Sequence, residues 1–238
     1  NLNTARNSAS GAGTQTAGLA IGGFSGGYPE VALTEEYGGT SWTESGDMST
    51  GRQDGSATGT QTATMYVGGR SGSPTTYYAN AEYYDGTSWT DAPANTPSAR
   101  SAQSSAGTQT AAILVSGFAG SPHVVSATSL EWDGSSWTAG GDYLVSTYNF
   151  GSAGGTQTAS IFAGGNPNLT ASNSYDGTSF STNPSIATGR EGSGGLHGGS
   201  STSTAGAIFA GPTGSVSAAT EEFTGEVETE TARTIDFD

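Results

Sequence analysis

Four arginines recur near the start of successive stretches of small residues and could bind an anion: Arg6, Arg52, Arg100 and Arg190. A guanidinium group binds a carboxylate through paired N–H donors, so a ring of such groups could hold an acidic sugar or a carboxylate peptide. The alternative, which we favour, is that each arginine ties its own repeat to acidic loop residues. The acidic candidates are Asp47, Asp91 and Asp142.

Five aromatic or imidazole side chains lie in the segments that differ most between repeats: Tyr28, Tyr77, Tyr78, Phe118 and His123. Aromatic rings stack on sugar rings, and exposed loops commonly carry binding residues. These loops are therefore the predicted ligand-binding region. Their aromatic residues do not recur in register, which counts against a lectin with one sugar site per repeat.

The chain offers little for metal or thiol chemistry. It has no cysteine and two histidines, and neither His123 nor His197 has a second histidine or a carboxylate at ligand spacing. No metal and no cofactor are expected. The Asp-Gly pairs at Asp85, Asp133 and Asp176 lack further oxygen ligands at alternate positions. They predict hairpins with two-residue type I′ turns, in which both central residues have positive φ.

Two pairs of adjacent glutamates stand in predicted strands, Glu35 with Glu36 and Glu221 with Glu222. Neighbouring residues of a strand point to opposite faces, so neither pair can act together as general acid and general base. A solvated strand face is expected instead. The innermost strands offer mainly Ser, Ala and Gly, so no catalytic residue is assigned and the sequence predicts a protein that is not an enzyme.

Five repeats must position these side chains. The phrase Gly-Thr-Gln-Thr-Ala begins at Gly13, Gly59, Gly107 and Gly155, and a divergent copy begins at Ser201. The spacings are 46, 48, 48 and 46 residues. A period of this length, built from short segments rich in β-formers and turn residues, is typical of propeller blades rather than helical solenoids.

Each repeat predicts four antiparallel strands: a stretch of tiny residues, an apolar run, a segment ending in an aromatic residue, and a segment opening with Trp or Phe. The apolar runs are 19–23, 65–69, 113–117, 161–165 and 208–211. The third segments end at Tyr37, Tyr84, Trp132, Tyr175 and Phe223, and the fourth open at Trp42, Trp89, Trp137 and Phe180. In the last repeat, residues 231–237 are the expected outermost strand.

The predicted fold is an all-β, five-bladed β-propeller with four antiparallel strands per blade, in one domain spanning residues 1–238. The expected blades are 1–47, 48–94, 95–142, 143–185 and 186–238. Small residues suit the narrow centre, and the large rings are expected between blades, each contributing roughly 2–3 kcal/mol. Blades one and five are expected to meet without a shared strand, with strand exchange at the seam as the alternative.

The repeat resembles the kelch repeat, which has an arginine before the inner strand, Gly-Gly after the second strand, an aromatic residue before a turn and a Trp on the fourth strand. In the first repeat these are Arg6, Gly22, Gly23, Tyr37 and Trp42. The resemblance covers essentially the whole chain, with Tyr148 at the arginine place of the fourth repeat, Arg190 four residues early in the fifth, and Phe180 in place of Trp. Kelch propellers include galactose oxidase, whose copper site needs a Tyr-Cys crosslink that a chain without cysteine cannot form.

The combination of Gly-Thr-Gln-Thr-Ala with a downstream Asp-Gly-Thr-Ser-Trp-Thr is similar to propeller repeats of marine bacteriophage virion and tail proteins and of bacterial surface proteins. This resemblance implies a non-enzymatic structural or recognition module of a virion appendage or cell surface, acting in assembly or host attachment. A carbohydrate-binding, lectin-like propeller is the alternative. The partners it implies are virion or surface-scaffold proteins, further copies of the chain and cell-surface glycans.

The charge balance excludes other partners. Twenty-one acidic residues against six arginines give a net charge of -15. A surface this acidic repels nucleic-acid backbones and anionic lipid heads. No apolar run is long enough to span a bilayer. Nucleic-acid binding and membrane insertion are therefore not expected, and the expected location is a virion or the cell exterior.

Overall fold

A computed structural model describes residues 1–26, 30–72, 75–119, 124–149 and 152–192, together with three strands of the last repeat, Gly194–Gly195, Ala205–Phe209 and Thr220–Thr224. The described part consists of strands, turns and loops, with no helix. Every paired strand in it is antiparallel to its neighbour. The all-β prediction is confirmed.

Four sheets have four strands each, and consecutive main strands pair in sequence order. The first sheet contains β1 (Ser10–Gly13), β2 (Gly18–Ile21), β3 (Thr34–Tyr37) and β4 (Trp42–Glu44). The second contains β5 (Ser56–Thr60), β6 (Ala63–Val67), β9 (Ala81–Tyr84) and β10 (Trp89–Asp91). The third contains β12 (Ser104–Gly107), β13 (Ala112–Val115), β16 (Ser129–Trp132) and β17 (Trp137–Ala139). The fourth contains β18 (Ser152–Thr156), β19 (Ala159–Ala163), β20 (Ser172–Tyr175) and β21 (Phe180–Thr182).

Three smaller sheets complete the described strands. The fifth sheet joins β22 (Gly194–Gly195), β23 (Ala205–Phe209) and β24 (Thr220–Thr224). Two others involve the loops after the second strands. In one, β7 (Arg70–Ser71) pairs with β8 (Thr76–Tyr77). In the other, β14 (Phe118–Ala119) pairs with β15 (Val124–Val125) and with β11 (Arg100–Ser101), which precedes the inner strand β12. The outermost strand predicted at 231–237 lies outside the described residues.

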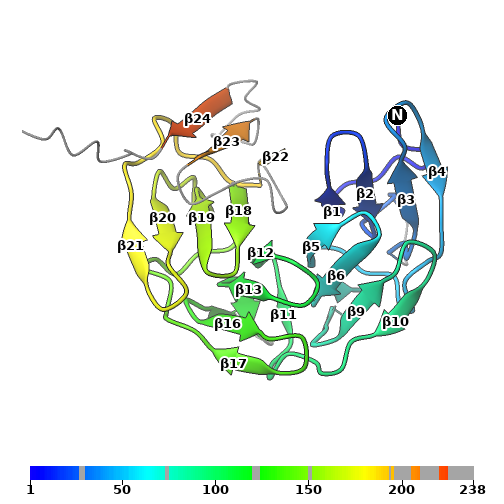
Figure 1. Cartoon of the computed structure of the whole chain (residues 1–238), viewed down its shortest axis with the longest axis horizontal. Helices are drawn as coiled ribbons and strands as arrows, with labels where there is room; N and C mark the ends of the chain where they lie inside the picture. Colours follow the sequence, from blue (N-terminus) through cyan, green and yellow to red (C-terminus); the bar gives the residue numbers. More distant parts are fainter. Residues whose placement is uncertain are drawn as a thin grey trace, which may run out of the picture.

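The sheets follow one another along an arc, with β1, β5, β12 and β18 nearest the middle and β4, β10, β17 and β21 at the outside (Figure 1). Successive inner strands lie side by side, because their small side chains let the backbones approach. The hydroxyls of Ser56 and Ser105 are 2.7 Å apart across one such pair, and the Thr58 hydroxyl donates to the Gly107 carbonyl at 2.8 Å. The inner strands therefore form a hydrogen-bonded centre.

Among the described residues the hydrophobic core forms three clusters, each between two successive sheets. Between the first and second sheets, Leu19 and Ile21 pack against Tyr66 and Tyr84, with Trp89 at the edge. The cluster between the second and third sheets is Met65, Val67, Ala81, Ala92, Ala112, Leu114, Leu130 and Trp132. The cluster between the third and fourth is Ala106, Ile113, Val115, Tyr143, Ala153, Phe162, Tyr175 and Phe180. The large rings therefore lie between sheets, as the sequence predicts.

The third and fourth strands meet at the predicted residues, but the turn between them differs from the prediction. Trp132 pairs with Trp137, so the loop has four residues, and Gly134 has a φ of 93° whereas Asp133 does not have positive φ. The Asp133 carboxylate accepts hydrogen bonds from the backbone N–H groups of Ser135 and Ser136 at 2.8 and 2.7 Å. Aspartate therefore organises this turn through its side chain, an Asx turn rather than a type I′ turn.

Candidate functional site

Two of the predicted arginines form buried ion pairs inside their own sheets. The Arg6 guanidinium lies 3.2 Å from the Glu35 carboxylate, and both side chains are 0% exposed. Arg52 pairs with Glu82 in the same way at the second residue of β9. Each guanidinium also donates to backbone carbonyls, as Arg6 does to Leu33 at 3.3 Å. These pairs fix the chain before the inner strand to the third strand of the same sheet.

Two sequence expectations are corrected by this arrangement. Glu35 lies in the interior rather than on a solvated strand face, because the Arg6 segment covers that side of β3. Glu36 points the other way and accepts a hydrogen bond from the Tyr84 hydroxyl at 2.6 Å. The opposite orientation of the two glutamates is therefore confirmed. The carboxylate that holds each of these two arginines is a strand glutamate, whereas acidic loop residues such as Asp47 were expected.

Arg100 and Arg190 are also buried, at 5% and 0% exposure. Arg100 donates to the carbonyl of Thr128 at 3.1 Å and to its hydroxyl at 2.7 Å. Arg190 donates from Nε to the Thr188 carbonyl at 3.3 Å. The Gly165 N–H donates to the Arg190 carbonyl at 2.8 Å, as the Gly69 N–H does to the Arg100 carbonyl. Arg190 therefore occupies the repeated place, although it lies four residues early in the sequence.

The four arginines thus face internal partners and do not form an open ring on the surface. Burial lowers the pKa of Arg6, and the neighbouring Glu35 carboxylate opposes that shift. Burial also lowers the pKa of Arg100. A guanidinium remains protonated at neutral pH even so. The role of these arginines in ligand binding stays a prediction.

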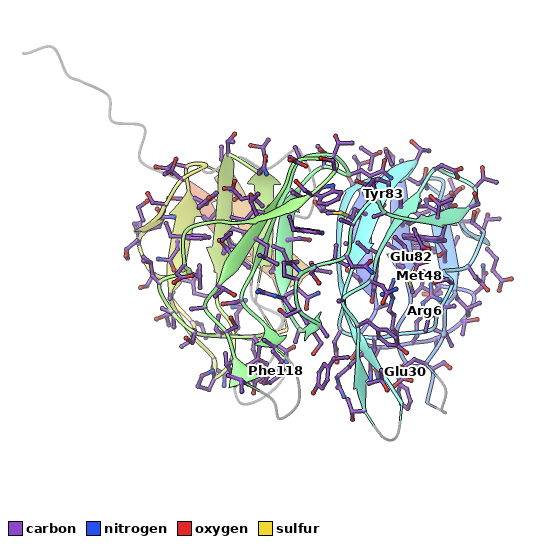
Figure 2. All side chains as sticks on the ribbon, turned by 90° about the horizontal axis from the view of Figure 1, so that it is seen from below. Arg6, Glu30, Met48, Glu82, Tyr83 and Phe118 are labelled. Carbon is purple, nitrogen blue, oxygen red and sulfur yellow. The ribbon has the colours of Figure 1, made fainter. Side chains whose placement is uncertain are left out.

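The loop candidate Phe118 lies at one end of the molecule. Glu30 lies at the same end, whereas Tyr83 is at the opposite end (Figure 2). Phe118, on β14, stacks on Tyr148 with ring centroids 4.1 Å apart. Both rings are half-buried. This pair forms an apolar platform contributed by two successive repeats.

The two tyrosines of the second repeat have different surroundings. The Tyr78 ring lies 5.6 Å from the Arg52 guanidinium, and its hydroxyl is 2.7 Å from that of Ser71. Tyr77, on β8, is half-buried, and partial burial raises the pKa of its hydroxyl. Tyr78 is therefore tied to the interior, whereas Tyr77 belongs to the hairpin. Tyr28 and His123 lie outside the described residues, as does His197.

A buried glutamate in this region was not found from the sequence. Glu30 is 4% exposed and accepts hydrogen bonds from the Gln53 side chain at 3.3 Å and from the Gly72 N–H at 2.9 Å. It joins the loop of the first repeat to the hairpin of the second. Glu30 lies in a loop without periodicity, so no sequence pattern distinguishes it from a solvated acid.

The repeated glutamine of Gly-Thr-Gln-Thr-Ala was likewise given no role from the sequence. Gln61 donates to the carbonyls of Gly18 and Tyr37 at 3.0 and 2.9 Å, both in the preceding sheet. Gln109 makes the same two bonds to Thr64 and Tyr84 at 3.0 and 2.9 Å, and Gln157 to Ala112 and Trp132 at 3.2 and 3.0 Å. Each accepting pair consists of residues that face each other across the second and third strands. We call this contact the glutamine clamp.

The described residues show no grouping of His, Asp or Glu side chains suited to a metal ion. Nor does this part of the chain contain a helix with the length and hydropathy needed to cross a membrane. The polar contacts there include the arginine–glutamate pairs, the Arg70–Asp54 ion pair, the glutamine clamps and the Asp turns. These contacts hold strands and neighbouring sheets to one another.

Comparison with known proteins places the fold. No protein-family model matches the chain, and no curated protein is similar to it in sequence. A solved structure titled "Structure of YjhT" is similar, with a TM-score of 0.70 at 12% identity, over 88% of this chain and 74% of that one. At this identity the likeness concerns the fold alone. Together with the arc of antiparallel sheets, it indicates a β-rich, propeller-like fold.

Proposed function

We propose that the chain is a closed, five-bladed kelch-like propeller that acts as a non-enzymatic structural or recognition module. Its place would be a phage virion appendage, such as a tail fibre, or a cell-surface protein, in assembly or host attachment. The observation that carries this proposal is the division of the molecule into a repeated interior and non-repeated loops.

Closure of the ring is supported by the register of the fifth sheet. At three junctions the clamp glutamine donates to the carbonyls of a facing residue pair at the same place in the preceding sheet. In the fifth sheet the corresponding facing pair is Gly206 and Phe223. Gln15, the glutamine of the first repeat, is exposed. Its natural acceptors are therefore the carbonyls of Gly206 and Phe223.

A non-enzymatic role is supported by the use of the interior charges. The ion pairs Arg6–Glu35 and Arg52–Glu82 are buried, and the charged groups of each pair contact each other within one repeat. Catalysis needs titratable groups that can reach a substrate. Because these charged side chains are buried against each other, their role is to hold each repeat together.

Recognition is assigned to the end that carries the loops between second and third strands. Loops held by a rigid scaffold are the usual place for binding residues. The Phe118–Tyr148 platform and the Tyr77 hairpin differ between repeats, whereas the interior repeats. The partners that fit are virion or surface-scaffold proteins and further copies of the chain. The carbohydrate-binding alternative is favoured by the same platform, because aromatic faces stack on sugar rings.

The experiment that tests this role is electron cryo-microscopy of the native particle or cell envelope that carries the chain. The proposal expects density that joins the propeller to a larger scaffold and leaves the Phe118 end in contact with, or facing, the recognition partner. A free monomer with sugar density on the Phe118–Tyr148 platform would favour the lectin. A small molecule among titratable groups at the centre would contradict the non-enzymatic assignment.

A further inference from the structure

The third sheet keeps the repeated arginine but lacks the repeated glutamate. Glu35 and Glu82 are the second residues of β3 and β9 and face Ala20 and Tyr66 across the sheet. The corresponding residue of β16 is Leu130, which faces Leu114. Leu130 is buried among apolar side chains between the second and third sheets. Arg100 therefore has no carboxylate where Arg6 and Arg52 have one.

Arg100 is nevertheless buried as deeply as its counterparts, with 5% exposure. Its guanidinium donates hydrogen bonds to a single residue, Thr128, whereas Arg6 and Arg52 each also contact a glutamate carboxylate. The backbone N–H of Ser116 donates to the same Thr128 carbonyl that Arg100 contacts. Arg100 is thus a buried guanidinium with no carboxylate at the place where Glu35 and Glu82 stand.

A buried charge without a partner is costly, and a guanidinium cannot avoid the cost by losing its proton. In the fourth repeat no charge is buried at this place, because Tyr148 stands in place of the arginine and Asn173 in place of the glutamate. The third repeat has lost the carboxylate alone. Burial lowers the pKa of Arg100 with no carboxylate opposing the shift. Thr128 is exposed, so this buried charge lies next to solvent.

The geometry points to a binding site for a small monovalent anion at Arg100, with the Arg100 guanidinium as the charged donor. The ligand is a halide such as chloride or a single carboxylate, which share one negative charge and acceptor-only chemistry. The anion would neutralise the buried charge of Arg100, as Glu35 neutralises Arg6 and Glu82 neutralises Arg52. This site depends neither on ring closure nor on the function of the loops.

Thermal unfolding of the full chain tests the site. At constant ionic strength set with methanesulfonate, which is neither a halide nor a carboxylate, chloride and acetate are titrated in separate series. A ligand that binds the folded state alone stabilises it, so each tenfold increase above the dissociation constant should raise the melting temperature by about 3 to 5 °C. A response to chloride alone identifies a halide site, and a response to acetate alone identifies a carboxylate site.

The decisive variant is Leu130→Glu, which restores the missing carboxylate. It should keep the fold and lose the anion response, because its own side chain then neutralises Arg100. Leu130→Met is the matched control and should retain the response. No response in the unsubstituted chain, or an equal response in Leu130→Glu, would overturn the proposal.

A second measurement needs no variant. Crystals of the unsubstituted chain soaked in bromide should show an anomalous peak within hydrogen-bond distance of the Arg100 guanidinium. A peak there supports the site even if Leu130→Glu does not fold. Crystals in which well-occupied bromide lies elsewhere and none lies at Arg100 would contradict a halide site, and the acetate series then decides the carboxylate form.

Discussion

The junction between the second and third sheets differs from the side of the first sheet that faces away from the second sheet, which we call the free side. Both are built from the same repeat. At the junction, Gln109 clamps two carbonyls of the preceding sheet, and Trp132 is fully buried. On the free side, Gln15 is exposed and Tyr37, the counterpart of Trp132, is half-buried. The comparison indicates that each repeat carries residues suited to contact with a neighbouring sheet. On the free side of the first sheet, Gln15 and its neighbours are therefore suited to an interface with a further sheet.

The largest expected effect is the loss of a large ring from a filled junction. Tyr84 is 0% exposed, packs on Trp89 with ring centroids 5.0 Å apart, and donates to Glu36 of the first sheet. Tyr84→Ala should lower the free energy of unfolding by about 3 to 5 kcal/mol, through lost burial and the cavity left behind. Urea unfolding measures this change.

Thr90→Ala is the matched control for Tyr84→Ala, because Thr90 is an exposed residue of the same sheet. Its effect should be within about 0.5 kcal/mol of zero. Equal effects of the two substitutions would mean that the junction does not stabilise the fold.

An intermediate effect is expected from a broken glutamine clamp. Gln109→Leu leaves the carbonyls of Thr64 and Tyr84 without their side-chain donor, at a cost of about 1 to 3 kcal/mol. Gln15→Leu sharpens the comparison, since a closed ring predicts a loss of similar size at the seam. No loss in Gln15→Leu beside a clear loss in Gln109→Leu would show that the seam is not clamped.

The smallest expected effect comes from an Asp turn at the edge of the sheets. Hydrogen bonds from the backbone N–H groups of Ser136 and Ser135, and from their hydroxyls, hold the pKa of Asp133 below its ordinary value. A depressed pKa stabilises the fold above the unfolded-state pKa of about 3.9, and this contribution is lost as pH falls through the folded-state pKa.

Melting temperatures measured between neutral pH and strong acid test this turn. The unsubstituted chain should lose more stability on acidification than Asp133→Asn, whose amide does not titrate. Asp91→Asn, at an exposed place on β10, is the matched control. If the unsubstituted chain and Asp133→Asn lose stability equally on acidification, the Asp133 carboxylate does not stabilise the turn.

The strands could be predicted from the sequence because short, repeated signals mark their ends. Tyr37 and Trp42 end and begin strands as expected, and the same holds at Trp132 and Trp137. The turn type was wrong because Asp-Gly is compatible with two solutions. The Asp133 side chain, rather than a second positive φ, decides between them.

The interior charges could be predicted less well. Alternation along β3 correctly separates Glu35 from Glu36, but it cannot say which side the chain before β1 will cover. A glutamate in a strand is expected to face solvent. The three-dimensional position of Arg6 is what places Glu35 in the interior instead. The loop residues Glu30, Tyr77 and Phe118 had no repeat to compare with, so their contacts emerged from the structure alone.

The measurement that tests the closed five-bladed ring most directly is a thiol crosslink across the seam. The chain has no cysteine, so engineered thiols are the sole reactive ones. Gln15→Cys with Thr224→Cys places one thiol at the clamp position and one directly after Phe223. The matched control across a filled junction is Gln61→Cys with Gly38→Cys, where Gly38 has open space for a side chain.

Both pairs are treated with a short bis-maleimide, cut by protease and analysed by mass spectrometry. The closed ring predicts an intramolecular crosslink of 15 to 224 in monomers, with a yield like that of the control pair. A control crosslink accompanied by no seam crosslink, or by seam crosslinks in dimers alone, would contradict closure and assign the free side of the first sheet to a second copy of the chain.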